Sequence, residues 1–354
     1  MVNEMAQPYD LPLDQLREYK PALTRRDDFD AFWNATLAEL AKVPLTYERT
    51  ELSYPVKGLK VYRVFYQGFN DARIEALLAL PEQADPLPGI VAFHGYNWCV
   101  DGDIHDTVNQ ALKGYAVLKM FCRGQHGESE DNVVSSNGHV AGWMAKGIQN
   151  KDEYYYRAVY MDAVRAIDIL AAMPEVNADR IAVTGGSQGG AITLAAAALS
   201  NVPKLAVADH PYLSNFERAI DTTPRGPYSE LNDYFRRHSG SPAIETNAKE
   251  TLSYFDIMNL APRISCYSWL TIGLVDDITP PSTVFAVYNH LTCDKDIAVY
   301  RYFGHELVPG SIAPRLQLFM DYQQRFELSF IAAYVPALPV NSLGFGLSIP
   351  LHKK

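Results

Sequence analysis

The sequence predicts an α/β fold in which a mostly parallel, twisted sheet is covered by helices on both faces. Short apolar runs alternate with longer helical segments from about residue 90 onward, which is typical of parallel sheets. A second observation supports this fold: the apolar run 180–184 is followed by Gly185-Gly186-Ser187-Gln188-Gly189 and then by an alanine-rich stretch. Strand, Gly-x-Ser-x-Gly and helix in this order form a nucleophile elbow.

The first eighty residues predict two different kinds of structure. Residues 11–43 have the apolar spacing of amphipathic helices, so we expect a helical extension at the N-terminus. From Tyr47 to Leu80 the pattern changes to short alternating segments, which favour antiparallel strands at one edge of the sheet. The proline-bounded stretch 81–88 has the composition of a loop.

After this loop, strands and helices alternate along the chain. The predicted strands are Ile90–Phe93, Ala116–Phe121, Ile181–Thr184, Leu205–Ala208, Ser268–Ile272 and Ile297–Tyr302. The predicted helices are Val108–Lys113, Asp152–Met173, Gln188–Ser200, Ser282–Leu291 and Ala313–Phe330. We interpret residues 1–330 as a single domain and residues 331–354 as a C-terminal tail with no assigned packing.

The stretch 211–260 interrupts the alternation, because it is polar and aromatic. We interpret it as an insertion between two core units. It either caps an active site, forms a contact between subunits, or is a plain surface excursion; the sequence leaves these three possibilities open.

Composition excludes several classes of function. The net charge of −10 argues against a nucleic-acid surface. The four cysteines lie far apart and form no Cys-x-x-Cys pair, so we expect neither a metal site nor thioredoxin-like chemistry. The N-terminus lacks the features of a signal peptide, and no apolar stretch is long enough to span a membrane. We therefore expect a cytoplasmic protein.

Ser187, at the centre of the elbow, is the candidate nucleophile, and a serine hydroxyl needs a base within hydrogen-bonding distance. The elbow architecture provides its partners in the chain order serine, acid, histidine. His290, His305 and His352 satisfy this order. His290 lies inside a predicted helix and His352 in the tail, whereas His305 follows a predicted strand. Because functional side chains gather at the carboxyl ends of parallel strands, we favour His305.

Two neighbouring aspartates are candidates for the acid. Asp276 and Asp277 both follow the strand Ser268–Ile272, and spacing alone does not separate them, although we take Asp276. The oxyanion needs two donors, and the elbow provides the main-chain N–H of Gln188 as one. The loop after the strand Ile90–Phe93 provides Tyr96 N–H as the other.

Several separated segments together resemble carbohydrate esterase family 7, which comprises acetyl xylan esterases and cephalosporin C deacetylases of the α/β-hydrolase superfamily. The resemblance runs from about residue 11 to residue 330. The matching segments are His94-Gly95-Tyr96-Asn97, Arg123-Gly124-Gln125, Gly185-Gly186-Ser187-Gln188-Gly189-Gly190, Gly273-Leu274-Val275-Asp276, Pro280-Pro281-Ser282-Thr283-Val284-Phe285 and His305-Glu306.

The resemblance implies an α/β-hydrolase fold and a role for each matching residue. Ser187 would be the nucleophile, Asp276 the orienting acid and His305 the base, and this choice separates Asp276 from Asp277. The remaining residues would serve as oxyanion donors (Tyr96 and Gln188), as architecture around the site (Arg123, Gly124 and Gln125) and as walls of the substrate pocket (Pro227 and Tyr228). No cofactor is implied. A homohexamer, a dimer of trimers, is the assembly typical of the family.

The function implied is hydrolysis of acetyl esters of carbohydrates, such as acetylated xylo-oligosaccharides, and of cephalosporin C-like alcohols through an acetyl-serine intermediate. Three alternatives remain: a general short-chain carboxylesterase, a prolyl-oligopeptidase-like serine peptidase, and a non-catalytic binding scaffold. Family members carry a glycine-rich run where this chain has Trp98-Cys99-Val100-Asp101, so the resemblance does not define the shape of the pocket there.

Overall fold

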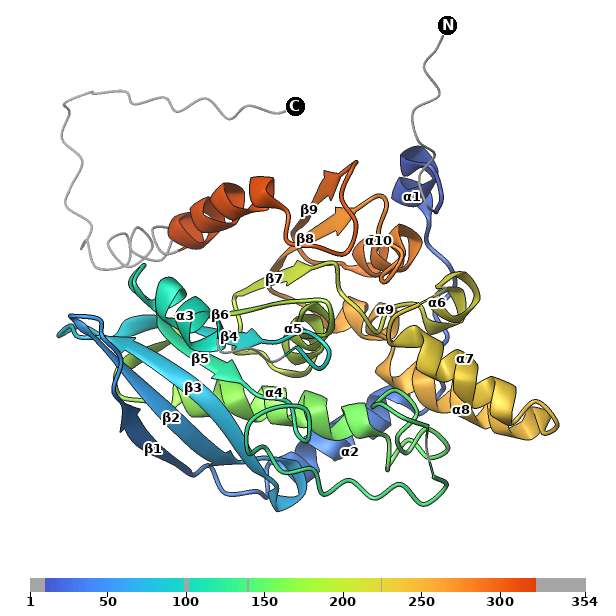
Figure 1. The fold of residues 1–354 in the computed structure, drawn as a ribbon, viewed down its shortest axis with the longest axis horizontal. Helices are drawn as coiled ribbons and strands as arrows, with labels where there is room; N and C mark the ends of the chain where they lie inside the picture. The colour runs from blue at the N-terminus through green and yellow to red at the C-terminus, as the bar shows by residue number, and fades with distance from the viewer. Residues whose placement is uncertain (1–9, 99–101, 139, 224, 323–354) are drawn as a thin grey trace, which may run out of the picture.

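The computed structural model describes residues 10–98, 102–138, 140–223 and 225–322 (Figure 1). Within these ranges one sheet has the strand order β1-β2-β3-β5-β4-β6-β7-β8-β9. Its strands are β1 (Tyr47–Leu52), β2 (Leu59–Gln67), β3 (Arg73–Pro81), β4 (Leu87–Phe93), β5 (Ala116–Met120), β6 (Val176–Gly186), β7 (Leu205–Asp209), β8 (Tyr267–Gly273) and β9 (Lys295–Tyr300).

The sheet is antiparallel at one edge and parallel elsewhere. Strands β1, β2 and β3 pair antiparallel with one another, and β3 pairs antiparallel with β5. From β5 onward every neighbouring pair is parallel. This confirms the predicted α/β fold with an antiparallel N-terminal edge. The carboxyl ends of β4, β6, β7, β8 and β9 consequently lie at the same end of the sheet.

Helices cover both faces of the sheet (Figure 1). Helices α4 (Tyr155–Ala171) and α5 (Gln188–Leu199) belong to the larger apolar core, together with α2 (Phe29–Leu40). Helix α3 (Gly102–Ala111) and the helical residues 312–322 belong to a smaller core on the opposite face. The remaining helices are α1 (Leu13–Glu18), α6 (Phe216–Thr222), α7 (Tyr228–Arg237), α8 (Pro242–Phe255), α9 (Ile257–Leu260) and α10 (Pro281–His290).

The apolar runs of the sequence explain the central elements. All seven residues of β4 are buried, as expected for a parallel strand covered on both faces. Every residue of α5 is also buried, and its alanines and glycines allow the helix to pack closely against β6 and β7. This places the first turn of α5 directly beneath the carboxyl ends of the central strands.

Some predicted boundaries differ from those observed. The predicted helix 108–113 overlaps α3, which begins six residues earlier and ends two residues sooner. The predicted strand 297–302 also ends two residues sooner, because residues 301 and 302 form a turn. The N-terminal extension divides into α1 and α2. The described part of the last predicted helix is residues 312–322, and the tail 331–354 lies outside the described residues.

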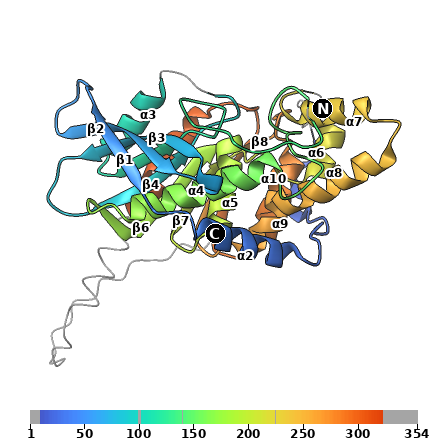
Figure 2. The ribbon, with the colours of Figure 1, turned by 90° about the horizontal axis from the view of Figure 1, so that it is seen from below.

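The insertion 211–260 is helical and lies between β7 and β8. It contains α6 to α9, which lie together to one side of the sheet in both views (Figures 1 and 2). The buried carboxylate of Asp256 anchors its base, because it accepts main-chain N–H groups from Asn215, Phe216 and Met258 at 2.8–2.9 Å. Burial raises the pKa of Asp256 to about 6.

Candidate active site

Ser187 occupies the sharp turn between β6 and α5. Its φ and ψ angles are 57° and −119°, a region that non-glycine residues rarely adopt and that costs conformational energy. Neighbouring hydrogen bonds hold the turn: the Ser187 N–H donates to the carbonyl of Asp209 at 3.0 Å, and its carbonyl accepts from the N–H of Tyr212 at 3.0 Å. The serine therefore stands at the carboxyl edge of the sheet and at the N-terminus of a buried helix.

The glycines of the Gly-x-Ser-x-Gly motif are required by close main-chain contacts. A Cβ atom on Gly189 would lie 2.2 Å from the carbonyl oxygen of Phe93, and one on Gly185 would lie 2.5 Å from the main chain of Gly189. Any larger residue at these positions would force the helix away from the sheet. The motif thus fixes the distance between the serine and the ends of the neighbouring strands.

His305 meets Ser187 from the loop that follows β9. Its Nε2 atom lies 2.9 Å from Ser187 Oγ. A Cβ atom on Gly273, the last residue of β8, would lie 2.1 Å from the carbonyl oxygen of Phe303. Glycine at this strand end therefore allows the histidine loop to pack closely enough for the imidazole to face the serine.

The other two candidate histidines, and His94 in the loop after β4, do not contact Ser187 in the described residues. In helix α10, His290 places Nδ1 2.7 Å from the carbonyl oxygen of Ala286. His352 lies outside the described residues. His94 is buried, and its Nε2 atom accepts the N–H of Cys122 at 2.9 Å, which braces the loop after β4.

Asp276 is fully buried and contacts the far side of the imidazole. Its Oδ2 atom lies 2.9 Å from His305 Nδ1. The carboxylate also accepts the N–H groups of Ile278 and Thr279 at 2.9 and 2.8 Å, and the Thr279 hydroxyl at 2.8 Å. Burial opposes ionisation, but the hydrogen bond and charge of His305 and the Thr279 N–H outweigh it and lower the pKa of Asp276. The group is therefore held as a carboxylate that fixes the imidazole.

Asp277 has a different partner from its neighbour. It forms a bidentate ion pair with Arg225, with N···O distances of 2.6 and 2.8 Å. Beside this pair, a Cβ atom on Gly226, whose φ is +76°, would lie 2.9 Å from Ile278 Cδ1. The ion pair and this close contact join the acid loop to the insertion. Of the two aspartates, the structure brings Asp276 against His305.

The two expected oxyanion donors come from the loop after β4 and the first turn of α5. Tyr96 lies in the first of these segments and Gln188 opens the second. The Gln125 amide links them, since its Oε1 atom accepts both the Asn97 N–H and the Gln188 side-chain Nε2 at 3.0 Å. Its Nε2 atom donates to Gln188 Oε1 at 2.9 Å. Gln125 therefore fixes the two donor segments relative to each other.

Arg123 is buried behind the site and contacts neither Ser187 nor His305. Its guanidinium donates to both carboxylate oxygens of Asp162 at 2.7 and 2.8 Å and to Asn132 at 3.0 Å. A Cβ atom on Gly124, whose φ is +66°, would lie 2.7 Å from the Trp143 ring. The Arg-Gly segment thus holds the chain that carries Gln125.

The sequence analysis did not single out Glu230, which contacts Tyr96 from helix α7. The Tyr96 hydroxyl lies 2.7 and 2.9 Å from the two carboxylate oxygens of Glu230, one of which also accepts the Met144 N–H at 3.0 Å. Burial and the nearby carboxylate raise the pKa of Tyr96, so the hydroxyl stays protonated and donates. A Cβ atom on Gly142 would lie 2.1 Å from this carboxylate. No local sequence motif identifies Glu230, because its hydrogen-bond partners come from distant segments of the chain.

The sequence analysis also did not assign a role to His210, which packs against His305. The centres of the two rings are 4.5 Å apart. Burial, followed by the neighbouring His305, lowers the pKa of His210 to about 4, so the ring is neutral at pH 7. His210 directly follows β7. Its position at a strand end is the signal that could have identified it.

The two expected pocket residues differ in exposure. Tyr228 is fully buried, and its hydroxyl accepts the Ser214 N–H at 3.0 Å while its ring packs 4.1 Å from that of Tyr212. Pro227 is half-buried at the start of α7. Trp98 is exposed, and the residues that follow it, 99–101, lie outside the described residues.

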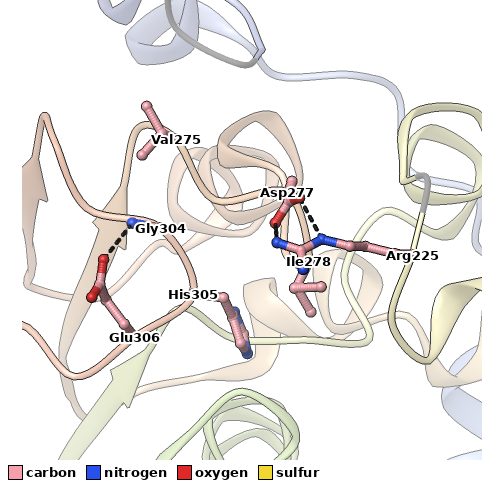
Figure 3. A pocket seen from close by; sticks show the side chains of 7 residues that line it. All are labelled: Arg225, Val275, Asp277, Ile278, Gly304, His305 and Glu306. Atoms are coloured by element: carbon pink, nitrogen blue, oxygen red, sulfur yellow. Dashed lines mark hydrogen bonds and ion pairs between the residues drawn. The ribbon is translucent and has the colours of Figure 1, made fainter.

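A cavity of about 630 Å³ lies beside His305 and is lined by Arg225, Val275, Asp277, Ile278, Gly304 and Glu306. Figure 3 shows the Arg225–Asp277 pair on one side of the imidazole and Glu306 on the other. In the part of the chain that the structure describes, no group of three or more histidine, cysteine, aspartate or glutamate side chains is arranged to hold a metal ion. None of the described helices is long and apolar enough to cross a membrane.

Known proteins resemble this chain over most of its length. The acetyl xylan esterase (AXE1) family matches residues 5–322. The acetyl esterase Axe7A of Xylanibacter ruminicola is 28% identical over 284 residues, which cover 78% of this chain and 63% of that protein. This chain therefore spans less than two thirds of that curated relative.

Two solved structures cover the fold more completely. The acetyl xylan esterase from Paenibacillus sp. R4 is 39% identical with a TM-score of 0.85, and the match covers 88% of this chain and 100% of that one. The acetyl xylan esterase 1 from Thermoanaerobacterium sp. JW/SL YS485 is 35% identical with a TM-score of 0.84, over 88% and 99% of the respective chains.

Proposed function

Because the chain belongs to the acetyl xylan esterase family, we propose that it is a serine esterase that removes acetyl groups from esterified sugars such as acetylated xylo-oligosaccharides. One observation carries this proposal: the hydrogen-bonded chain from Asp276 through His305 to Ser187, with both distances at 2.9 Å. This arrangement activates a serine for attack on a carbonyl carbon. The acetyl esterase activity named for the relatives supports acetyl as the acyl group.

The first half of the reaction forms an acetyl-serine. Ser187 Oγ attacks the acetyl carbonyl carbon while His305 Nε2 takes the hydroxyl proton, and Asp276 stabilises the imidazolium that results. The negative charge on the carbonyl oxygen is held by the main-chain N–H groups of Tyr96 and Gln188. Collapse of the tetrahedral intermediate breaks the bond to the sugar oxygen, which receives the proton from His305.

The second half releases acetate. Water donates a proton to His305 Nε2 and attacks the acetyl-serine carbonyl, and a second tetrahedral intermediate forms at the same oxyanion donors. Its collapse breaks the bond to Ser187 Oγ, which recovers a proton from the imidazolium. The histidine therefore acts once as base and once as acid in each half.

The proposal includes two further features of the family. Cephalosporin C-like acetyl esters are candidate substrates beside the sugar esters. The assembly proposed is a homohexamer, a dimer of trimers, to which the insertion contributes contacts. Light scattering tests the assembly directly: a mass six times that of one chain supports it, and a monomer mass contradicts it.

Hydrolysis of 4-nitrophenyl acetate by the wild type and by Ser187→Ala tests the function. We expect the variant to lose turnover while its unfolding curve matches the wild type, and normal turnover by a folded variant would refute the proposal. A panel of acyl chains tests the acetyl preference: acetate is expected to exceed butyrate strongly, and equal rates on octanoate would indicate a general carboxylesterase. A fluorophosphonate probe should label Ser187, which a non-catalytic scaffold would not allow.

A further inference from the structure

Cys266 and Cys293 lie opposite each other where two neighbouring strands begin. Strands β8 and β9 pair in parallel with Ser268 opposite Lys295, and the Ser268 N–H donates to the carbonyl of Asp294 at 3.0 Å. Continuing this register by two residues towards the amino ends places Cys266 opposite Cys293. Both side chains also pack against the same apolar core, as expected for opposed residues, whose side chains point to one face of the sheet.

Both sulfur atoms contact one hydroxyl group. Cys293 Sγ lies 3.7 Å from Ser268 Oγ, and the Ser268 hydroxyl also hydrogen-bonds to the Cys266 sulfur. Neighbouring strands lie about 4.7–4.9 Å apart, which falls within the range of about 4.4–6.8 Å between the Cα atoms of a disulfide. The spacing of the paired strands is therefore compatible with a bond between the two sulfurs.

The two cysteines differ in exposure, which gives them different parts in a thiol exchange. Both are free thiols, and Cys293 is half-buried whereas Cys266 is buried. Burial, followed by the neighbouring Cys293, raises the pKa of the Cys266 thiol to about 12. Cys266 is therefore protonated at pH 7 and is a weak nucleophile towards an external oxidant. Cys293 is the thiol that an oxidant reaches first.

We propose that Cys266 and Cys293 form a disulfide site, which is oxidised by a small-molecule disulfide such as oxidised glutathione. The Cys293 thiolate attacks one sulfur of the oxidant, which forms a mixed disulfide and releases one glutathione thiolate. Cys266 then loses its proton and attacks the Cys293 sulfur, which releases the second glutathione thiolate. Two protein thiols are oxidised to one disulfide, and the oxidant is reduced to two thiols that take up the two protons.

The bond closes a ring of residues 266–293, which contains Asp276 and helix α10. It joins the amino ends of β8 and β9, whereas Asp276 and His305 follow the carboxyl ends of these strands. A cross-link stabilises the folded state mainly because it restricts the unfolded chain. We therefore expect the disulfide to stabilise the unit that carries Asp276 while the site keeps its geometry. This inference does not depend on the proposed esterase function.

The test equilibrates the full chain with reduced and oxidised glutathione, alkylates the remaining thiols with iodoacetamide and digests the protein with trypsin. Both cysteines fall on one tryptic peptide, residues 264–295, because no lysine or arginine lies between Arg263 and Lys295. From the folded protein we expect this peptide without label and lighter by two hydrogen atoms. Because a bond that stabilises the fold is equally favoured by it, the equilibrium constant for the bond should be at least about 30-fold larger than in urea.

Oxidation should also raise the midpoint of thermal unfolding by about 4 °C or more. Cys293→Ser removes the more exposed partner and should abolish both the bonded peptide and this shift, and Cys266→Ser should do the same. If Cys266→Ser fails to fold, Cys293→Ser decides alone. Cys99→Ser is the matched control, because it removes one cysteine and retains the pair, so both effects should persist.

Four results would overturn the inference. The peptide from oxidised folded protein could carry two labels, or it could retain glutathione on a cysteine in place of the bond. The equilibrium constant could be the same in the folded chain and in urea. The thermal shift could persist in folded Cys293→Ser.

Discussion

Removal of the Glu230 carboxylate tests whether the insertion positions the oxyanion loop. Glu230 lies on helix α7, and its two oxygens lie 2.7 and 2.9 Å from the Tyr96 hydroxyl. The same carboxylate accepts the Met144 N–H at 3.0 Å. The Glu230→Ala variant removes the carboxylate, so the Tyr96 hydroxyl and the Met144 N–H lose this acceptor. The loop that carries Tyr96, a proposed oxyanion donor, thereby loses one of its anchors.

The expected fall in kcat is estimated from the two lost hydrogen bonds, those of the Tyr96 hydroxyl and the Met144 N–H, and from the proposed role of the Tyr96 loop. A hydrogen bond to a charged group contributes about 1.5–3 kcal/mol, and Glu230 is only partly buried, so solvent compensates part of the loss. Complete loss of one oxyanion donor costs about 2.7–4 kcal/mol of activation free energy. Because the Tyr96 loop would be displaced but not removed, we expect a fall in kcat of about 10- to 100-fold.

The assay separates positioning from simple destabilisation. We expect kcat for 4-nitrophenyl acetate to fall while KM changes less than about threefold, since the oxyanion donor acts mainly in the transition state. Glu230→Gln retains one carbonyl acceptor and should recover part of the activity. Glu245→Ala on helix α8, where Glu245 pairs with Lys249 on the surface, is the control in the same insertion. Wild-type kcat in a folded Glu230→Ala protein would refute the reasoning.

Three further predictions concern other parts of the chain. Asp276→Asn should lower kcat about 10⁴-fold with little change in the unfolding midpoint, because an amide no longer selects the required imidazole tautomer; a loss below tenfold would contradict its assigned role. Gln125→Ala should lower kcat about tenfold with KM within twofold, since Gln125 links the two oxyanion segments, and an unchanged kcat would count against that link. Burial raises the pKa of Asp256 from 3.8 to about 6. The free energy of unfolding should therefore be highest below pH 3.8 and fall by about 3 kcal/mol as the pH rises through 6, because the folded state holds the Asp256 proton more tightly than the unfolded state. Urea unfolding at several pH values should show this slope in the wild type and not in Asp256→Asn, and equal slopes would refute it.

The sequence predicted the central architecture because its signals are local. The apolar run 90–93 lies within a fully buried strand, and the glycines around Ser187 are explained by contacts within the motif and with the adjacent strand. The order of serine, acid and histidine then reduced nine histidines to three candidates. The structure brings His305 against the serine.

The residues that could not be predicted depend on contacts between distant segments. Asp256 anchors main-chain groups about 40 residues earlier in the chain, and Glu230 contacts a loop 134 residues away. Neither contact has a periodicity or a motif. Spacing also could not distinguish Asp276 from Asp277, because the difference lies in the partners, His305 for one and Arg225 for the other.

The insertion contacts two loops of the site, which argues that it is part of the catalytic unit. Glu230 contacts Tyr96 in the loop after β4, and Arg225 contacts Asp277 in the loop after β8. The serine, acid and histidine come from strand ends and contact one another directly. The insertion instead constrains the two loops that surround the reacting ester, so changes within it should alter substrate selection and kcat more than the identity of the nucleophile. In the proposed esterase a strand-end triad supplies the chemistry, and we expect the helical insertion to influence which ester reaches it.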